Sequence, residues 1–279
     1  MFRDKLSIST WSLHRCLGPL RWTVWDEVSK QPVVSEESQP LELALTDLPK
    51  ELASRGFRFA EVCHFHLPST DDAYLAELKD AFNRADVRFH TLLVDYGDIS
   101  SPDPVRREAD IRYLQEWIGV ASKAGADAVR IVAGEQAPTD QEAIARCQAA
   151  LKQLQEYASK LGVRIVSENF RALTSTVSSW SRVVEGMGAG FQTIVDFGNF
   201  ALDEKEEGIA YGSPLAYTIH AKPRYLEDGS VDREEFGRMV SILKEHGCEA
   251  PVSLIFDRPG NMWDGIERIK TELLLAAGE

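Results

Sequence analysis

The sequence predicts a single (β/α)8 barrel, and three observations support this fold class. Short apolar runs rich in Ile, Val and Phe alternate with longer amphipathic stretches, which is typical of βαβ units with parallel strands. The runs number eight, and 279 residues is a length that suits an eight-stranded barrel. A doubly wound open sheet is the main alternative, but no GxGxxG follows the first strand to support a dinucleotide site.

The predicted strands are short and are rich in β-branched residues. In chain order we expect them at residues 6–10, 58–63, 88–94, 128–133, 163–168, 192–197, 216–221 and 251–257. Because the alternation of strand and helix patterns continues along the chain, we expect one domain over residues 1–279.

Three stretches between the strands carry helix start signals. Residues 139–142 read TDQE, a capping box in which the Thr139 hydroxyl and the Glu142 carboxylate would satisfy free backbone N–H groups. Residues 101–102 (Ser-Pro) and 232–235 (Asp-Arg-Glu-Glu) predict two further helix starts.

The helix that follows the capping box has a clear apolar stripe. It ends at Gly162, a typical helix stop, and the stripe consists of Ile144, Leu151, Leu154 and Tyr157.

Residues 14–40 interrupt the alternation between the first strand and the first helix. This long irregular segment carries Trp22 and Trp25 and is expected over the face where the strands end. Two interpretations stay open: a lid that closes over an active site, and a surface insertion packed by its tryptophans.

Composition and charge restrict the classes of partner. The chain is 44% hydrophobic and 27% charged, which is ordinary for a globular protein, and its net charge of −13 argues against a nucleic-acid partner. A small anionic substrate remains compatible, since a few local Lys or Arg side chains suffice to hold one. No signal core or membrane-length apolar run is visible, so we expect no membrane partner. The cysteines, Cys16, Cys63, Cys147 and Cys248, form no CxxC pair, which favours packed thiols in a reducing cytoplasm.

Polar residues gather where the predicted strands end, and in a barrel these ends form the face that holds the active site. The set consists of Trp11, His14, Glu61, His64, His66, Asp95, Glu135, Glu168, Asn169, Arg171, Asp196, Asn199, His220, Lys222, Arg224, Asp257 and Arg258.

Three of these residues follow consecutive strands and are expected to converge: Glu168, Asp196 and His220. Two carboxylates and an imidazole suit a divalent cation such as Mn²⁺, Mg²⁺ or Zn²⁺. The ion would also offset the desolvation of Glu168, which is a costly charge at the end of an apolar strand. The alternative is a buried ion network with nearby lysine or arginine.

Other strand-end residues are candidates for binding a substrate. In the HFH stretch at residues 64–66, both histidines could bind metal, or one is packed and His66 faces the substrate; we favour the second arrangement. Trp11 and His14 are expected to line the same cavity, whereas His90 and His246 are expected to be structural. The four cations Arg171, Lys222, Arg224 and Arg258 are expected either to hold a phosphate or carboxylate or to balance charge.

Four short motifs in strand order resemble one known family. They are SISTWSLH at 7–14, VSENF at 166–170, IVDFGN at 194–199 and IHAK at 219–222. Together they resemble the xylose-isomerase-like barrel superfamily of sugar-phosphate isomerases and epimerases. That superfamily includes ketose 3-epimerases, hydroxypyruvate isomerases, inosose-processing enzymes and endonuclease-IV repair enzymes.

The resemblance implies a divalent metal held by Glu168, Asp196 and His220, with a fourth carboxylate on the eighth strand. At that fourth position this sequence has Ile255, and Asp257 follows two residues later, expected on the same face of the strand. Asn199 stands where the family has a substrate-binding histidine.

The resemblance further implies isomerase chemistry on a sugar, sugar phosphate or polyol through a metal-stabilised enediolate. Glu168 would be both base and ligand, and Lys222 or metal-bound water would be the acid. Because Ile255 replaces the second carboxylate, aldose–ketose isomerisation or β-elimination of water fits better than two-base epimerisation. The alternative is a barrel without catalysis that acts as a carbohydrate-binding or regulatory protein; self-association stays open.

Overall fold

Eight parallel strands close into a barrel in the computed structural model, which describes residues 2–279. The fold class predicted from the sequence is therefore confirmed. In spatial order the strands run β1, β10, β9, β8, β7, β6, β5 and β4, and β4 pairs with β1 to close the ring. Their bounds are β1 Leu6–Ser9, β4 Phe59–Cys63, β5 Arg88–Val94, β6 Ala128–Ile131, β7 Arg164–Glu168, β8 Thr193–Asp196, β9 Ala216–Ala221 and β10 Val252–Leu254.

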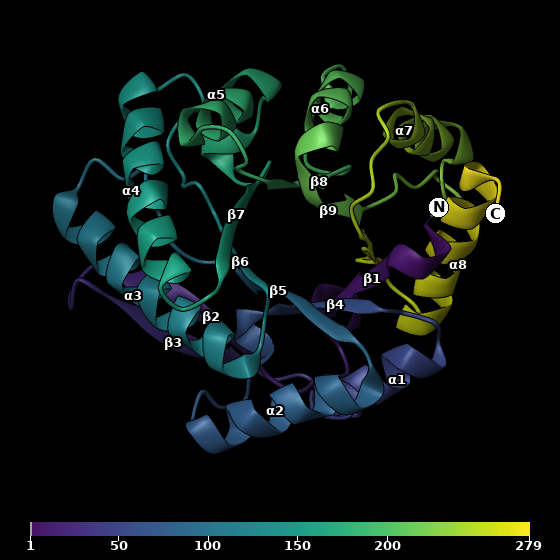
Figure 1. Cartoon of the computed structure of the whole chain (residues 1–279), viewed down its shortest axis with the longest axis horizontal. Coiled ribbons are helices and arrows are strands. Elements are labelled where there is room, and N and C mark those ends of the chain that lie inside the picture. Colours follow the sequence, from purple (N-terminus) through teal and green to yellow (C-terminus); the bar gives the residue numbers. More distant parts are fainter. Residues whose placement is uncertain (1) are drawn as a thin grey trace.

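Helices surround the barrel and connect successive strands (Figure 1). They are α1 Leu48–Ser54, α2 Asp72–Ala85, α3 Pro104–Ala124, α4 Gln141–Ser159, α5 Val177–Met187, α6 Lys205–Gly212, α7 Arg233–Glu245 and α8 Met262–Ala277.

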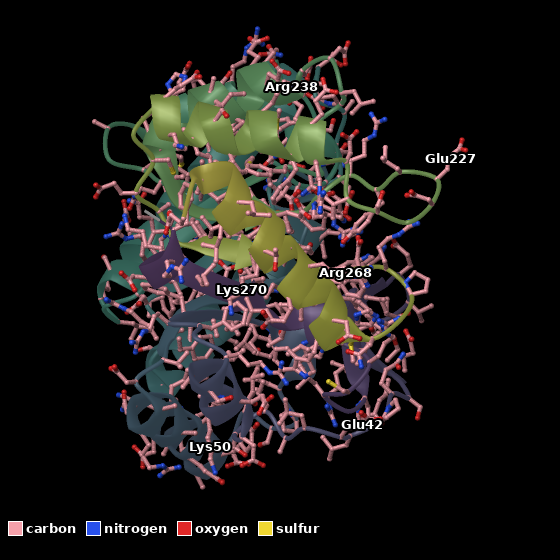
Figure 2. The ribbon with its side chains drawn as sticks, turned by 90° about the vertical axis from the view of Figure 1, so that its right-hand side faces the viewer. Glu42, Lys50, Glu227, Arg238, Arg268 and Lys270 are labelled. Atoms are coloured by element: carbon pink, nitrogen blue, oxygen red, sulfur yellow. The ribbon has the colours of Figure 1, made fainter. Side chains whose placement is uncertain are left out.

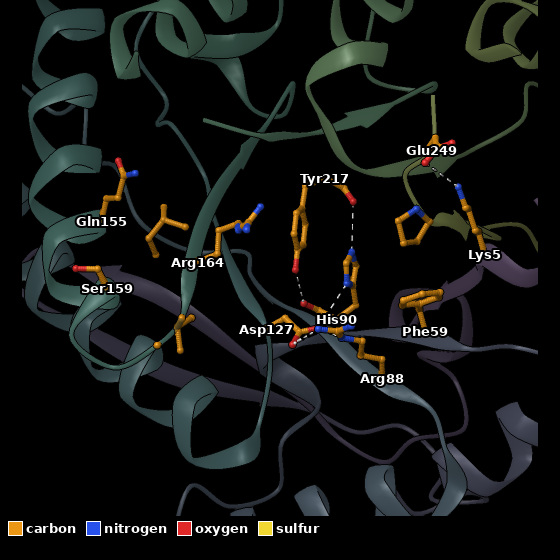
Figure 3. Close-up of a pocket in the computed structure, with 14 residues that line it drawn as sticks. Lys5, Phe59, Arg88, His90, Asp127, Gln155, Ser159, Arg164, Tyr217 and Glu249 are labelled. Atoms are coloured by element: carbon orange, nitrogen blue, oxygen red, sulfur yellow. Dashed lines mark hydrogen bonds and ion pairs between the residues drawn. The ribbon is translucent and has the colours of Figure 1, made fainter. Parts of the chain in front are cut away.

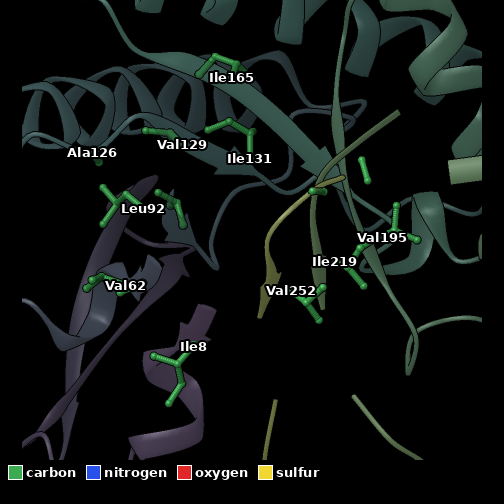
Figure 4. Close-up of a cluster of buried hydrophobic side chains, with 14 of the residues drawn as sticks. Ile8, Val62, Leu92, Ala126, Val129, Ile131, Ile165, Val195, Ile219 and Val252 are labelled. Atoms are coloured by element: carbon green, nitrogen blue, oxygen red, sulfur yellow. The ribbon is translucent and has the colours of Figure 1, made fainter. Parts of the chain in front are cut away.

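Alternation along the strands separates two sets of side chains. Ile8, Val62 and Leu92 belong to the large buried cluster between strands and helices (Figure 4). Neighbouring positions Cys63 and Leu93 belong to a second, smaller cluster. Because successive side chains of a strand point to opposite faces, the second set fills the barrel interior.

The outer surface of the helices is charged. Figure 2 shows Arg238 on α7 and Arg268 and Lys270 on α8 along one side of the molecule. Lys270 Nζ donates to the Arg55 carbonyl, and Arg238 pairs with Glu206 and Glu234. Across residues 2–279, every helix is too short or too polar to cross a bilayer.

The predicted helix starts need two corrections. α4 begins at Gln141 and is capped by Asp140, whose carboxylate accepts from the Ala143 N–H, so the Thr139 capping box is wrong by one residue. α3 begins at Pro104 behind Asp103 rather than at Ser101-Pro102, because the Asp103 carboxylate accepts from the Val105 N–H. The start behind Asp232 is confirmed, since its carboxylate accepts from Glu235 N–H.

The end of α4 also differs from the prediction. The helix ends at Ser159, and Gly162 lies three residues further on with φ of 71°. The apolar stripe is confirmed for Ile144, Leu151 and Leu154, which are buried, while Tyr157 is partly buried against the same core.

The segment 14–40 is not irregular. Its residues form an antiparallel hairpin of β2 Leu20–Asp26 and β3 Gln31–Glu37. The hairpin lies beside α3 (Figure 1). Its Thr23 hydroxyl lies 2.6 Å from the hydroxyl of Tyr113 on α3 and 3.2 Å from His64 Nε2 in the turn after β4.

The last strand is shorter than predicted. β10 ends at Leu254, so Ile255 and Asp257 lie in the loop that follows. The expectation that Asp257 shares a strand face with Ile255 is therefore wrong, because the loop no longer follows the two-residue repeat of a strand.

Candidate metal centre and substrate cavity

A cavity of about 290 Å³ lies at the carboxyl ends of the strands. Each barrel strand or the residue directly after it contributes one lining side chain: Ser9, Cys63, Leu93, Arg130, Glu168, Asp196, His220 and Ile255. Loop residues complete the wall: Trp11, Trp22, Asp95, Phe170, Arg171, Asn199, Lys222 and Asp257.

Glu168, Asp196 and His220 meet at the base of this cavity. One potential ligand atom from each residue lies within 4.8 Å of the other two. His220 Nδ1 is 3.4 Å from Glu168 Oε1 and 3.5 Å from Asp196 Oδ2. β8 and β9 place Asp196 and His220 side by side in register, which explains why residues 24 positions apart converge.

Asn169 fixes the relative positions of the two carboxylate-bearing strands. Its side-chain amide donates to the Asp196 carbonyl at 3.0 Å, and its oxygen accepts from the Asp196 N–H at 2.8 Å. This double hydrogen bond links the end of β7 to the end of β8. It sets the spacing between Glu168 and Asp196.

Glu168 is almost fully buried, with 3% of its surface exposed. Its Oε1 accepts from Asn199 Nδ2 at 3.2 Å. Its Oε2 lies 3.1 Å from Arg130 Nε, but the two groups are not aligned for a hydrogen bond, and both atoms lack a hydrogen-bond partner. A buried carboxylate oxygen without a hydrogen bond is costly, and it is typical of a ligand-binding position.

Arg130 supplies positive charge directly beside the cluster. It is buried in β6, forms an ion pair with Asp95 and donates to the Val94 carbonyl. Burial alone would lower the pKa of Arg130, but the charges of Asp95 and Glu168 raise it above its ordinary value. Arg130 therefore stays charged.

A third buried carboxylate contacts His220 at its other ring nitrogen. Glu61 is fully buried, and its Oε2 lies 2.7 Å from His220 Nε2. Burial alone would raise the pKa of Glu61, yet the charge and hydrogen bond of His220 lower it to about 2. Burial would lower the pKa of His220, whereas Glu61 and Glu168 raise it well above its usual value.

The residues present fit a divalent metal with three protein ligands. Two carboxylates and an imidazole are appropriate donors, and Glu168 Oε2 is a buried atom that lacks a hydrogen bond. Ile255 adds no fourth donor, so the remaining coordination positions would be left for solvent or substrate oxygens.

Lys222 and Asp257 form a separate charged pair on the cavity wall. Lys222 Nζ lies 2.7 Å from Asp257 Oδ2. Burial would lower the pKa of Lys222, but the hydrogen bond from Asp257 and the charge of Asp196 raise it. Asp257 thus pairs with Lys222, and Lys222 carries a proton.

Aromatic side chains form another part of the wall. Trp11 and Trp22 line the cavity, with ring centroids 6.3 Å apart and an edge-to-face arrangement. Trp22 comes from the β2–β3 hairpin, so this insertion contributes directly to the cavity. Flat apolar rings of this kind suit the C–H faces of a sugar ring.

The structure brings most of the predicted site residues together, but four of the residues expected to line the cavity or bind substrate lie outside its lining: His14, His66, Arg224 and Arg258. His66 is buried in a 3₁₀ turn, His64–His66, where its Nδ1 lies 2.8 Å from the Thr10 hydroxyl. Arg224 pairs with Asp232 at 3.6 Å, and the Arg258 guanidinium lies over the Tyr225 ring. His14, which was expected to line the cavity with Trp11, stacks on the Trp11 ring and is not part of the lining.

Two residues of the site were given no role from the sequence. Arg130 lies within a predicted apolar strand, and Glu61 is named only as one of the polar residues gathered at the strand ends. The available signal was the same for both: a single charge inside an otherwise apolar run, as in AVRIVA and FAEVC. A charge at such a position requires a buried partner.

Comparisons with known proteins agree with this geometry. A family model described as xylose isomerase-like TIM barrel matches residues 49–272. No curated protein sequence matches the chain.

Solved structures match over nearly the whole chain. An L-ribulose 3-epimerase has a TM-score of 0.70 at 15% identity, covering 98% of this chain and 95% of its own. The IolI protein, solved with a bound zinc atom, has a TM-score of 0.71 at 16% identity and 98% coverage of both chains. D-allulose 3-epimerase from Methylomonas sp. has a TM-score of 0.69 at 16% identity, covering 100% of this chain and 98% of its own.

Proposed function

Because this chain belongs to the xylose isomerase-like TIM barrel family, we propose that it is a metal-dependent enzyme of the sugar isomerase and epimerase type. Its substrate is a ketose, a sugar phosphate or a polyol ketone, and the reaction moves a proton at the carbon beside the carbonyl through an enediolate.

The observation that carries the proposal is the buried cluster of Glu168, Asp196 and His220 at the base of a small cavity. A volume of about 290 Å³ is at the lower end of small-molecule sites, which suits a single sugar ring. Two of the similar structures are ketose 3-epimerases and a third holds zinc, which supports the same class of ligand and ion.

A divalent ion bound there supplies Lewis-acid polarisation of a carbonyl and its neighbouring hydroxyl. Glu168 is the base, since its side chain lines the cavity and its Oε2 lacks a hydrogen bond. Lys222 is the acid, because its raised pKa keeps it protonated. It donates its own proton to the carbonyl oxygen in an isomerisation or to the departing hydroxyl in an elimination, while Glu168 holds the proton taken from carbon and delivers it to the neighbouring carbon in an isomerisation. Arg130, beside Glu168, stabilises negative charge that develops on the substrate.

Ile255 decides among the reactions of this class. Inversion at carbon requires a second base on the opposite face of the substrate, and an isoleucine side chain cannot remove a proton. Aldose–ketose isomerisation and β-elimination of water need one base and one acid. Glu168 and Lys222 provide this pair.

The other predicted roles belong to the same proposal. Trp11, Asn199, Arg171 and Asp257 contact the substrate from the cavity wall. The β2–β3 hairpin closes one side of the cavity through Trp22, as a lid or as a fixed wall. His66, Arg224 and Arg258 could act only on a substrate that extends beyond the cavity.

A second candidate function is a carbohydrate-binding or regulatory barrel without catalysis. Two observations favour it: Ile255 provides no ligand, and Arg130 already compensates part of the charge of Glu168. Both functions use the same cavity, so only a measurement of catalysis distinguishes the enzyme from the binding protein.

The test has two measurements on the purified protein. Metal content is measured after loading with Mn²⁺ or Zn²⁺, for the wild type and for Glu168→Gln, His220→Ala and the control His90→Ala. Ketoses, ketose phosphates and polyol ketones are then incubated in D₂O, and deuterium incorporation beside the carbonyl is followed by NMR.

We expect one ion per chain in the wild type and in His90→Ala, and a loss of at least 100-fold in affinity in the other two variants. Deuterium uptake that depends on Glu168 supports the enzyme. Binding of sugars without deuterium uptake supports the binding protein, and an unloaded wild type with no deuterium uptake overturns the metal-dependent reaction.

A further inference from the structure

Glu61 is a charged residue in the barrel interior that the proposed reaction does not use. It lies in β4 with no exposed surface, and it does not line the cavity. A buried carboxylate at such a position needs a specific reason, because desolvating it costs several kcal/mol.

Its single ion-pair contact among residues 2–279 is with His220. Glu61 Oε2 lies 2.7 Å from His220 Nε2, while Nδ1 of the same ring points to Glu168 and Asp196 at 3.4 Å and 3.5 Å. The imidazole therefore bridges two regions: the interior on its Nε2 side and the cavity on its Nδ1 side.

His220 stabilises the charge of Glu61 most strongly, and the charge of His90 and the nearby Ser253 side chain add smaller contributions. Thr91 is the register partner of Glu61 on β5, and the Thr91 hydroxyl has no hydrogen bond. Glu61 Oε1 also lacks a hydrogen-bond partner. His220 is thus the main partner of the ionised side chain and makes a hydrogen bond to its Oε2.

We propose that Glu61 is a positioning residue that holds His220 with its Nε2–H directed into the barrel and its Nδ1 directed at Glu168 and Asp196. In metal sites a histidine ligand commonly donates its second N–H to a carboxylate, which fixes the ring and strengthens its donor nitrogen. The consequence for metal affinity rests on the proposed function, whereas the hydrogen bond does not.

The first test measures the hydrogen bond without metal. In ¹⁵N-histidine-labelled protein, the Nε2 proton of His220 should exchange slowly with solvent and resonate downfield. Glu61→Leu, which keeps the volume and removes the acceptor, should abolish this signal. Glu61→Gln, which keeps a neutral acceptor, should retain it with faster exchange. Thr91→Val, a buried control in the same layer, should leave it unchanged.

The second test measures Zn²⁺ affinity by calorimetry in the same variants. Loss of such a partner typically weakens metal binding about 10–100-fold. We expect that loss for Glu61→Leu, a smaller loss for Glu61→Gln, and less than a twofold change for Thr91→Val. If Glu61→Leu fails to fold, Glu61→Gln supplies both measurements.

The outcomes separate the two proposals. A protected His220 proton with unchanged zinc affinity in the Glu61 variants would overturn the positioning role. A wild type that binds no zinc but loses the protected proton on Glu61 substitution would overturn the proposed function and leave the orientation of His220 by Glu61 established.

Discussion

The two ends of the barrel are both hollowed and both charged, but they use their charges differently. At the amino-terminal end a groove of about 710 Å³ is lined by residues that include Arg88, His90, Asp127 and Tyr217 (Figure 3). At the carboxyl end the cavity is less than half as large. The larger hollow therefore lies opposite the candidate metal centre.

The charged side chains at the two ends differ in how far they are exposed to solvent. The Arg88 and Asp127 side chains of the amino-terminal pair are 65% and 28% exposed, while those of the Arg130–Glu168 pair are 4% and 3% exposed. His90 stacks on Tyr217 at 4.3 Å, whereas His220 faces three carboxylates. The volume of a cavity is therefore a poor indicator of the functional site in this protein. Buried charged side chains that converge on one point are a better indicator.

The largest expected contrast is between two arginines. Arg130→Met should lower the free energy of unfolding by about 3–5 kcal/mol, because it leaves Asp95 and Glu168 buried without their counter-charge. Arg88→Met removes an exposed pair and should cost at most about 1 kcal/mol. Urea unfolding of both variants measures the difference, and equal losses would show that the two ends do not differ in this way.

The carboxyl end should also make stability depend on pH. Burial lowers the pKa of His64 to about 4 and of His66 to about 3 from the usual 6.5. Between pH 6.5 and 4 the unfolded chain binds protons that the folded chain does not, so stability falls as pH falls. Each histidine contributes about 1.4 kcal/mol per pH unit over that window.

Unfolding in urea at pH 6, 5.5 and 5 measures this slope. The slope is proportional to the difference in bound protons between the unfolded and the folded chain. In His66→Gln this difference should be smaller by about one proton, so comparing the wild-type and variant slopes isolates the contribution of His66. An unchanged slope in the variant would mean that His66 titrates normally in the folded protein.

The smallest contrast concerns backbone strain. Arg171 follows β7 with φ 72° and ψ 174°, a conformation nearly restricted to glycine, and its guanidinium is 3.6 Å from Glu135. Asp86 ends α2 at φ 53° and ψ 38°, which aspartate tolerates.

Arg171→Gly should therefore stabilise the protein by about 1 kcal/mol and weaken substrate binding, while Asp86→Gly should change stability by less than ~0.5 kcal/mol. A thermal melt should show an increase of roughly 2 °C for the first variant alone. A lower melting temperature for Arg171→Gly would mean that its contacts outweigh the strain.

The sequence was sufficient to predict the barrel and the convergence of Glu168, Asp196 and His220. Strand positions follow from local apolar runs, and parallel strands necessarily bring their carboxyl ends together. Glu168, Asp196 and His220 could therefore be placed on one face without knowing any contact. The position of Asp257 and the ends of the helices could not be predicted as well, because a shift of one residue in a loop or a helix cap changes them.

Contacts between distant strands could not be predicted in the same way. Glu61 and His220 are 159 residues apart, and their meeting depends on the stagger and closure of the barrel. The β2–β3 hairpin was missed because its strands pack on α3 rather than in the main sheet, and most of its residues are partly exposed. Because such strands have only a weak apolar pattern, they are difficult to predict from the sequence.

Arg130 also bears on whether the protein can fold before it binds an ion. Small zinc-dependent domains are unfolded until the ion arrives, since their ligands repel one another without it. Here a guanidinium inside the barrel already balances Asp95 and Glu168. The chain can thus fold without the proposed ion, and under the proposed function metal supply would limit activity and not abundance.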